Sequence, residues 1–277
     1  RQDQARQQDV KFISASEPQY TFSSPECRHS TLYMEKRAVE GEPTVFSETF
    51  EFTANGEWHN LKPEDVQPYD TTTALYKEYT AEREKHIVFS PRLRELAAKL
   101  TAGENNPYLK AKRIFRWVND NFPWASAREY STIENIPEYV LDNRHGDCGQ
   151  VSLLFITLCR ISGIPAHFQS GFMMHPRAWN LHDWAEVYFE GVGWVPVDQS
   201  FGIPAFARNA DEEYFFLGGI DSWRMIVNTD YGMTLQPEKQ YPRSETVDFQ
   251  RGEVEWEGGN LYFPQWDYHM DIDYLNY

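Results

Sequence analysis

Three residues, in the order cysteine, histidine and aspartate, could together carry out nucleophilic catalysis. Cys148 stands in the run RHGDCGQ, His182 in LHDWAEVY and Asp198 in VPVDQS. A thiolate can attack a carbonyl carbon, an imidazole can take the thiol proton and return it, and a carboxylate can fix the tautomer of the imidazole. These residue types predict acyl transfer through a thioacyl intermediate.

The position of Cys148 favours the thiolate form. Asp147 is a good helix N-cap, and apolar residues follow it at helical spacing until Gly163 and Pro165 end the run. Cys148 is therefore predicted in the first turn of a buried helix, where free amides and the helix dipole stabilise a negative charge. The Asp147 carboxylate opposes this effect unless its side chain turns into the cap.

The chain has three cysteines, so they cannot all pair and at least one thiol is free. Cys159 lies near the C-terminal end of the same predicted helix, where the dipole disfavours an anion. Cys27 has no basic neighbour except Arg28. Cys148 is thus the candidate nucleophile, and the alternative is that it is a small buried apolar residue.

His182 and Asp198 belong to a predicted β-hairpin over residues 181–202. Alternation places His182 on one face and Asp183 on the other, and two glycines mark the turn. His182 and Asp198 then fall near the open ends of the paired strands, and the sequence does not set the register between them. Pro196 favours an edge strand or a bulge for the second strand.

Other elements must position these residues. We expect helices over residues 91–103 and 107–118, a short helix at residues 137–141, and a strand at residues 166–174. Residues 20–86 alternate as short strands, and Asn55-Gly56 favours a hairpin. The first ten residues are polar and rich in glutamine, so we expect a frayed end with no packed role.

These runs resemble the transglutaminase-like superfamily: GDC, a helix ending in RISGIP, and HDWAEVYFEGVGWVPVD, within residues 93–202. The resemblance implies that Cys148 is the nucleophile, His182 the base and Asp198 the orienting acid. It implies an α+β fold with a papain-like core, in which helices bearing the cysteine pack on an antiparallel sheet bearing the other two. No organic cofactor and no metal are implied.

Two positions depart from the pattern of the family. Asp183 follows the histidine where many relatives carry a small residue, and DQS at residues 198–200 stands where DPT is frequent. Either change can alter the pKa of the imidazole or the strand geometry. For the oxyanion hole we expect the Cys148 amide and, as a second donor, the Trp124 indole, with a core role as the alternative for Trp124.

We predict three parts: a tail and small β-rich region at residues 1–86, the catalytic core at residues 87–205, and a β-rich extension at residues 206–277. The extension resembles one that packs against the core in some bacterial members. Asp221 and Arg224 are expected to form a structural ion pair.

Composition excludes several classes of protein. With 26 basic and 42 acidic residues the formal charge is -16, and no basic run could follow a phosphate backbone, so nucleic acid is excluded as a partner. No stretch has the roughly 20 apolar residues that span a bilayer, so no membrane insertion is expected. The chain begins without methionine, which favours a removed targeting segment and an extracytoplasmic (periplasmic or secreted) location. The expected partner is a peptide or protein substrate, and the oligomeric state stays open.

Two rival functions remain open at this stage. One is a metal site, because the common ligand types are present, although no ligand spacing organises them: His145, Asp147, Cys148, His167, His175, His182 and Asp183. The other is a catalytically inactive relative that binds peptide or glycan. For the enzyme, we expect hydrolysis by a peptidase or amidase, or transamidation, on peptide-like substrates, since both reactions use the same three residues.

Overall fold

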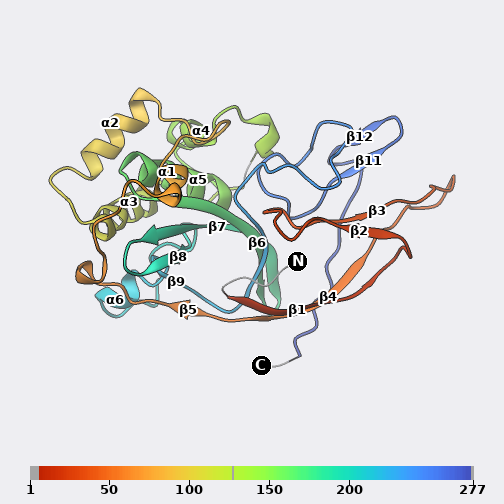
Figure 1. Ribbon diagram of the computed structural model, residues 1–277, viewed down its shortest axis with the longest axis horizontal. Helices are drawn as coiled ribbons and strands as arrows, with labels where there is room; N and C mark the ends of the chain where they lie inside the picture. The colour runs from red at the N-terminus through yellow and green to blue at the C-terminus, as the bar shows by residue number, and fades with distance from the viewer. Residues whose placement is uncertain (1–5, 127, 276–277) are drawn as a thin grey trace.

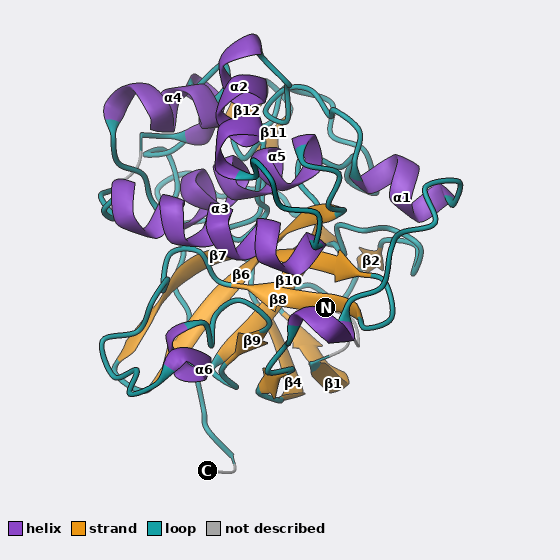
Figure 2. Ribbon diagram, turned by 90° about the vertical axis from the view of Figure 1, so that its left-hand side faces the viewer, coloured by secondary structure: helices purple, strands orange, loops and turns teal. Residues whose placement is uncertain are grey.

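The computed structural model describes residues 6–126 and 128–275. Its helices gather on one side of a central antiparallel sheet, and smaller strand pairs extend along the other side (Figure 1). The turned view shows the two layers, with helices above and strands below (Figure 2). The expected α+β class is therefore confirmed.

The central sheet carries four strands in the order β10-β6-β7-β8, and every neighbouring pair is antiparallel. Its strands are β6 (Ala166–His175), β7 (Ala178–Phe189), β8 (Gly193–Val197) and β10 (Arg224–Thr229). The predicted hairpin is β7 and β8, and Pro196 lies in the edge strand, where a residue without an amide proton disrupts no further ladder. β10 comes from beyond residue 205, so the sheet draws on both sides of that predicted boundary.

The helices form where caps and apolar spacing predict them. Ser90, Asn106, Asn135 and Asp147 each cap a helix by accepting a bond from a first-turn amide. The four longer helices are α2 (Pro91–Leu100), α3 (Pro107–Asn121), α4 (Ile136–Asn143) and α5 (Cys148–Ile161), and the short ones are α1 (Ala74–Tyr79), α6 (Ala210–Glu213), η1 (Pro63–Asp65) and η2 (Tyr130–Thr132).

Helix α5 is the centre of the core. Every residue from Gly149 to Arg160 is buried, and α5 packs against α2, α3 and α4 as well as β6 and β7. Phe115 of α3 meets Phe155 of α5 edge to face, with ring centroids 6.4 Å apart. Such dense packing fixes the start of α5, and with it Cys148, relative to the sheet.

The expectation of a frayed N-terminal end is wrong for the described residues. From residue 6 onward the chain is pinned to the sheet: Arg6 contacts Glu186 at 3.0 Å, and the Gln7 side chain both donates to and accepts from the backbone of Ile226, at 3.1 and 2.8 Å. Polar side chains alone predicted a solvated tail, but buried polar groups are stable when their hydrogen bonds are satisfied. Residues 1–5 lie outside the described part.

Short strand pairs make up the N-terminal region. They are β1 (Gln7–Ala15) with β4 (Glu48–Ala54), β2 (Tyr20–Phe22) with β3 (Leu32–Met34), and β5 (Glu57–Trp58) with β9 (Gly219–Ile220). The hairpin expected at Asn55-Gly56 is therefore wrong, because β4 and β5 flank that turn but pair with other strands. The chain passes from one small sheet into another there.

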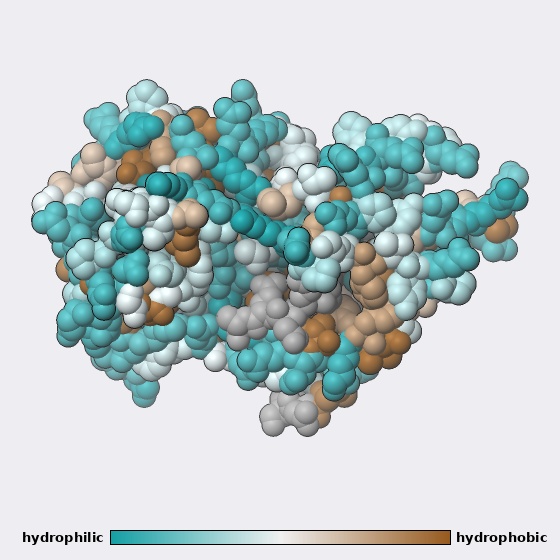
Figure 3. All heavy atoms as spheres, viewed as in Figure 1, coloured by the Kyte–Doolittle hydropathy of each residue, from teal (hydrophilic) through white to brown (hydrophobic). Residues whose placement is uncertain are grey.

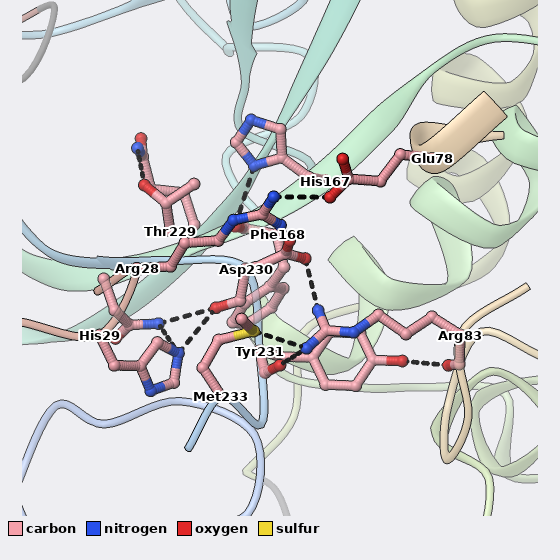
Figure 4. Close-up of polar contacts among 12 residues, drawn as sticks. Arg28, His29, Glu78, Arg83, His167, Phe168, Thr229, Asp230, Tyr231 and Met233 are labelled. Carbon is pink, nitrogen blue, oxygen red and sulfur yellow. Dashed lines mark hydrogen bonds and ion pairs between the residues drawn. The ribbon is translucent and has the colours of Figure 1, made fainter. Parts of the chain in front are cut away.

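An ion cluster around the buried Asp230 carboxylate fastens the N-terminal region to the end of β10 (Figure 4). The Asp230 carboxylate receives Arg28 on one oxygen and Arg83 on the other, each at 2.6 Å. The neighbouring His29 ring lies 3.1 Å from the Asp230 carbonyl oxygen, and burial lowers the pKa of His29 to about 4. Segments distant in sequence are thus held at one carboxylate.

The C-terminal stretch contains a small hairpin of β11 (Val254–Trp256) and β12 (Gly259–Leu261). Hydrophilic residues cover most of the face in Figure 3, and apolar ones gather in small groups near the side where Figure 1 labels β1 and β4. In the described part of the chain, no helix is both long and apolar enough to cross a bilayer.

Candidate active site

The hairpin brings His182 and Asp198 into direct contact. Nε2 of His182 lies 2.7 Å from Oδ2 of Asp198, and both side chains are buried. The other carboxylate oxygen accepts the Phe201 amide at 3.1 Å, so the carboxylate is held at both ends. Burial by itself would raise the pKa of Asp198, but His182 and Arg224 outweigh it and hold the pKa below its usual value. Asp198 is therefore an ionised, fixed partner for the imidazole.

Arg224 adds a cation to this pair. The predicted ion pair with Asp221 is confirmed at 2.7 Å, and the same Nη2 atom also lies 3.1 Å from Oδ2 of Asp198. The guanidinium carbon sits 4.5 Å from the centre of the Phe201 ring. Sequence reasoning missed the contact with Asp198, because the register between β10 and the distant hairpin leaves no local signal.

Cys148 is the first residue of α5, as the capping pattern predicts. Oδ1 of Asp147 accepts the Gln150 amide at 3.0 Å, and the hydroxyl of Tyr130 donates to the same oxygen at 2.5 Å. The Asp147 side chain is thus turned into the cap. Tyr130 was not among the predicted residues, since it comes from the short η2 turn and the sequence gives no sign that the turn reaches α5.

The Cys148 thiol points to Asp183. Its Sγ donates to Oδ2 of Asp183 at 3.6 Å, whereas no hydrogen bond or ion pair joins Cys148 to His182, both of which the structure describes. Burial, followed by the charges of Asp183 and Asp147, raises the pKa of Cys148 well above its usual value. The expected thiolate is therefore wrong for this state, because desolvation and two carboxylates outweigh the helix dipole.

Gly149 makes the approach of Asp183 possible. A Cβ atom at this position would lie 2.4 Å from the Tyr130 hydroxyl and 2.6 Å from Oδ2 of Asp183. Both distances are below van der Waals contact, and neither neighbour is at the end of a long flexible chain. The glycine in DCGQ therefore allows β7 and η2 to close on the start of α5.

A glutamine from the C-terminal stretch completes the group. Nε2 of Gln250 donates to the backbone carbonyl of His182 at 2.9 Å and to Oδ1 of Asp183 at 2.8 Å. Gln250 is buried, and it lies 67 residues beyond Asp183 in the chain. Nothing in the local sequence around Gln250 predicts this contact, which arises only from tertiary packing.

Trp124 lies beside the site, and its side chain is 60% exposed. Its backbone forms a parallel bridge with Gly146, and the following amide, of Ala125, donates to the Gly146 carbonyl at 3.0 Å. The alternative of a core tryptophan is therefore wrong. The role of the Trp124 indole as an oxyanion donor stays a prediction.

The candidate metal ligands are distributed over separate contacts. His167 faces Glu186 at 3.2 Å and Trp194 at a ring distance of 4.3 Å, while His175 faces Asp221 at 3.4 Å. Among residues 6–126 and 128–275, no group of three or more histidine, cysteine or acidic side chains is arranged to hold a metal ion.

The site therefore contains a buried imidazole, that of His182, which the Asp198 carboxylate orients. The next residue of β7, Asp183, accepts a hydrogen bond from the Cys148 thiol. The thiol is at the N-terminal end of a helix, where the free backbone amides can bind a developing oxyanion. These are the parts that acyl transfer needs, with the nucleophile in its neutral form.

Comparison with known proteins identifies the central region. The sequence model of the transglutaminase-like superfamily matches residues 94–199, a stretch that contains Cys148, His182 and Asp198. The protein YebA of Bacillus subtilis (strain 168), which is described as uncharacterized, is 27% identical over 140 residues. That match covers 43% of this chain but only 19% of YebA, so the chain spans a small part of that relative.

The fold is shared with one solved structure, and a second was compared. A candidate cysteine protease from Cytophaga hutchinsonii superposes with a TM-score of 0.56 and 18% identity, over 82% of this chain and 72% of that one. The periplasmic domain of TgpA from Pseudomonas aeruginosa gives a TM-score of 0.39 and 17% identity, over 66% and 63% of the two chains. Residues 94–199 therefore belong to the transglutaminase-like superfamily, and the chain has a transglutaminase-like fold.

Proposed function

We propose that the protein is a thiol-dependent acyl-transfer enzyme that acts on peptide or amide bonds, with Cys148 as nucleophile, His182 as base and Asp198 as orienting acid. The observation that carries the proposal is the buried His182–Asp198 contact of 2.7 Å, on the sheet against which α5 packs with Cys148 as its first residue. An ionised carboxylate buried against one imidazole nitrogen orients the ring, and this is its role in nucleophilic triads. Membership of the superfamily supports a thiol-dependent enzyme.

The first half of the cycle forms a thioester. His182 takes the proton of the Cys148 thiol, and the sulfur attacks the amide carbonyl, so that a carbon–sulfur bond forms. The negative oxygen is bound by the Cys148 amide and, in this proposal, by the exposed Trp124 indole. The carbon–nitrogen bond then breaks, and the amine leaves with the proton that His182 held.

The second half returns the thiol. Water or a second amine attacks the thioester, and His182 takes a proton from the attacking group. The carbon–sulfur bond breaks, and that proton returns to the Cys148 sulfur. Water gives a carboxylic acid, as in a peptidase or amidase, and an amine gives a new amide, as in a transamidase.

The resting contacts set a condition on the first step. The thiol donates to Asp183, and Asp183 directly follows the proposed base in β7. The thiol must therefore break its hydrogen bond to Asp183 and turn to His182 before the proton can be transferred. Binding of a substrate is the natural occasion for this exchange, because it displaces side chains around the nucleophile.

A second function is favoured by the same contact. The raised pKa of Cys148 and its bond to Asp183 also suit an inactive relative that kept the fold for binding peptide or glycan. In such a module the thiol has no role in turnover. Substitution of Cys148 would then leave ligand binding unchanged.

The experiment measures release of labelled peptides from a protein substrate mixture and incorporation of a fluorescent amine into the same mixture. We expect activity in one of the two assays, its loss in Cys148→Ala and His182→Ala, and its retention in Cys27→Ala, a cysteine outside the site. Release of peptides would indicate hydrolysis, and incorporation of the amine would indicate transamidation. Equal activity in wild type and Cys148→Ala would overturn the proposal.

A further inference from the structure

The thiol of Cys148 and the carboxylate of Asp183 form the closest polar contact at the nucleophile. They are 3.6 Å apart, and Asp183 is buried with 2% of its surface exposed. The triad chemistry described above does not use the Asp183 carboxylate.

Gln250 fixes the position of the Asp183 side chain, and Tyr130 and Gly149 border it. Nε2 of Gln250 donates to Oδ1 at 2.8 Å. The Tyr130 hydroxyl, whose proton goes to Asp147, lies 3.5 Å from Oδ2, the oxygen that accepts the thiol. The missing side chain of Gly149 leaves the space in which these groups meet. The Gln250 bond does not depend on the thiol, so the thiol adopts the position that Asp183 sets.

The Gln250 contact belongs to a buried segment of the C-terminal stretch, residues 244–250. Glu245, Val247, Asp248 and Gln250 are all buried, and Arg251 fastens the end of the segment by contacts with Glu245 at 3.1 Å and Glu129 at 3.3 Å. Glu129 directly precedes the η2 turn of Tyr130. The segment is thus anchored on both β7 and η2, the two elements that reach the nucleophile.

Charged and titratable groups face the thiol–carboxylate pair from each of these elements. They are Asp147 at the helix cap, Tyr130 in η2, Asp198 after β8, and Glu245 and Asp248 in the C-terminal stretch, where Arg251 interacts with Asp248. Burial, followed by the charge of Asp147, raises the pKa of Asp183 as well. The surroundings therefore oppose the appearance of a further negative charge on sulfur.

We propose that Asp183 is a positioning residue for Cys148. Gln250 of the C-terminal stretch holds the Asp183 side chain, a contact called the clamp below. Asp183 accepts the hydrogen bond of the Cys148 thiol and keeps the thiol protonated until a bound substrate displaces Asp183. The C-terminal stretch, which lies outside the matched core, then has a specific role at the active site. Release of the clamp frees the thiol for His182. This inference rests on the proposed function, since it assigns the state of the same nucleophile.

The test is the pH dependence of iodoacetamide labelling at Cys148, read by peptide mass spectrometry on the folded full chain. Asp183→Asn keeps the size of the side chain and removes its ability to ionise. We expect labelling at about pH 7 to become roughly threefold to tenfold faster, since a change of one pKa unit alters the thiolate fraction about tenfold. The midpoint of the profile moves to lower pH. Asp183→Ala, measured beside it, moves the midpoint in the same direction.

Gln250→Ala tests the clamp without changing any charge. We expect a smaller shift in the same direction, because the carboxylate remains but is no longer held against the thiol. Asp211→Asn and Gln265→Ala remove an equivalent charge and an equivalent amide on the exposed surface, and we expect the wild-type profile for both.

Two results would overturn the inference: profiles of both Asp183 variants that superpose on wild type, or a wild-type profile for Gln250→Ala. The labelling assay does not require turnover. Unchanged profiles combined with loss of turnover in Cys148→Ala would refute the clamp alone. Shifted profiles combined with full turnover in Cys148→Ala would refute the proposed function alone.

Discussion

Nη2 of Arg224 lies 3.1 Å from Oδ2 of Asp198, the oxygen that also contacts His182. The arginine comes from β10, which is outside the matched core, and it shares its Nη2 atom with Asp221. The proposed triad therefore has a fourth member, which stabilises the charge of the buried Asp198. β10 and β8 are the two edge strands of the central sheet, so the Arg224 side chain reaches Asp198, the residue after β8, from the opposite edge.

Arg224→Met tests how much this cation stabilises the fold. Removal of one partner from a buried ion pair leaves an uncompensated charge, so we expect the free energy of unfolding to fall by about 3 kcal/mol. Urea unfolding followed by circular dichroism measures it. The control is Arg208→Met, which removes an exposed pair with Glu212 and is expected to cost at most about 0.5 kcal/mol. Equal losses in the two variants would contradict the claim that Arg224 stabilises the fold through the buried Asp198 charge.

Gly149→Ala tests the close approach at the start of α5. The added Cβ would meet Tyr130 and Asp183 at 2.4 and 2.6 Å, so β7 or η2 must shift. We expect a loss of about 1–3 kcal/mol in the free energy of unfolding, as for overpacked cores. Gly56→Ala is the matched control, because its Cβ would meet only backbone atoms at 3.5 Å or more. A melting temperature equal to that of the control would refute the contact.

Asp230→Asn tests the cluster that fastens the N-terminal region. The substitution leaves Arg28 and Arg83 without their shared carboxylate charge, so we expect a loss of roughly 3 kcal/mol in the free energy of unfolding. Asp211→Asn breaks an exposed pair with Lys62 and is expected to cost about 0–1 kcal/mol. Both values come from urea unfolding, and the prediction fails if the two variants lose the same amount.

His86→Gln tests the pH dependence of stability. Burial lowers the pKa of His86 to about 4, so between about pH 6.5 and pH 4 the unfolded chain binds a proton that the folded chain does not. Wild type loses this stability as the pH falls through that window, and the variant does not. The cost of the substitution should therefore be about 2 kcal/mol smaller at pH 5 than at pH 7.

The control for this linkage is His269→Gln, because His269 is exposed near the end of the described chain. Its cost should be the same at both pH values. Urea unfolding at the two pH values measures both variants. A cost of His86→Gln that does not change with pH would show that this histidine is not held neutral by the fold.

Local patterns predict the elements of the site but not its tertiary contacts. The caps and apolar spacing predict the start of α5 at Cys148, and strand alternation predicts His182 and Asp198 near the open ends of one hairpin, because both signals depend on residues close in sequence. Gln250 reaches the site across 67 residues of chain, and no local pattern carries that information.

The state of the thiol shows the same limit in its electrostatics. The helix dipole could be inferred from sequence, but burial and the position of the Asp183 carboxylate depend on tertiary packing, and they reverse the sign of the expected shift in the pKa of Cys148. The polar residue Gln7 shows the same limit. Its sequence context predicts a solvated tail, but its side chain is buried and forms a hydrogen bond to Ile226, which only the tertiary structure reveals.

The most direct test of the account is a search for the covalent intermediate. The folded chain is mixed with the activated ester p-nitrophenyl acetate, quenched in acid and digested, and the acetylated peptide is identified by mass spectrometry. The account predicts one acetyl group on Cys148 in wild type, slower acetylation in His182→Ala, and no acetyl group on the corresponding peptide of Cys148→Ala. Acetylation at other positions with Cys148 unmodified, or an equal rate with and without His182, would contradict it.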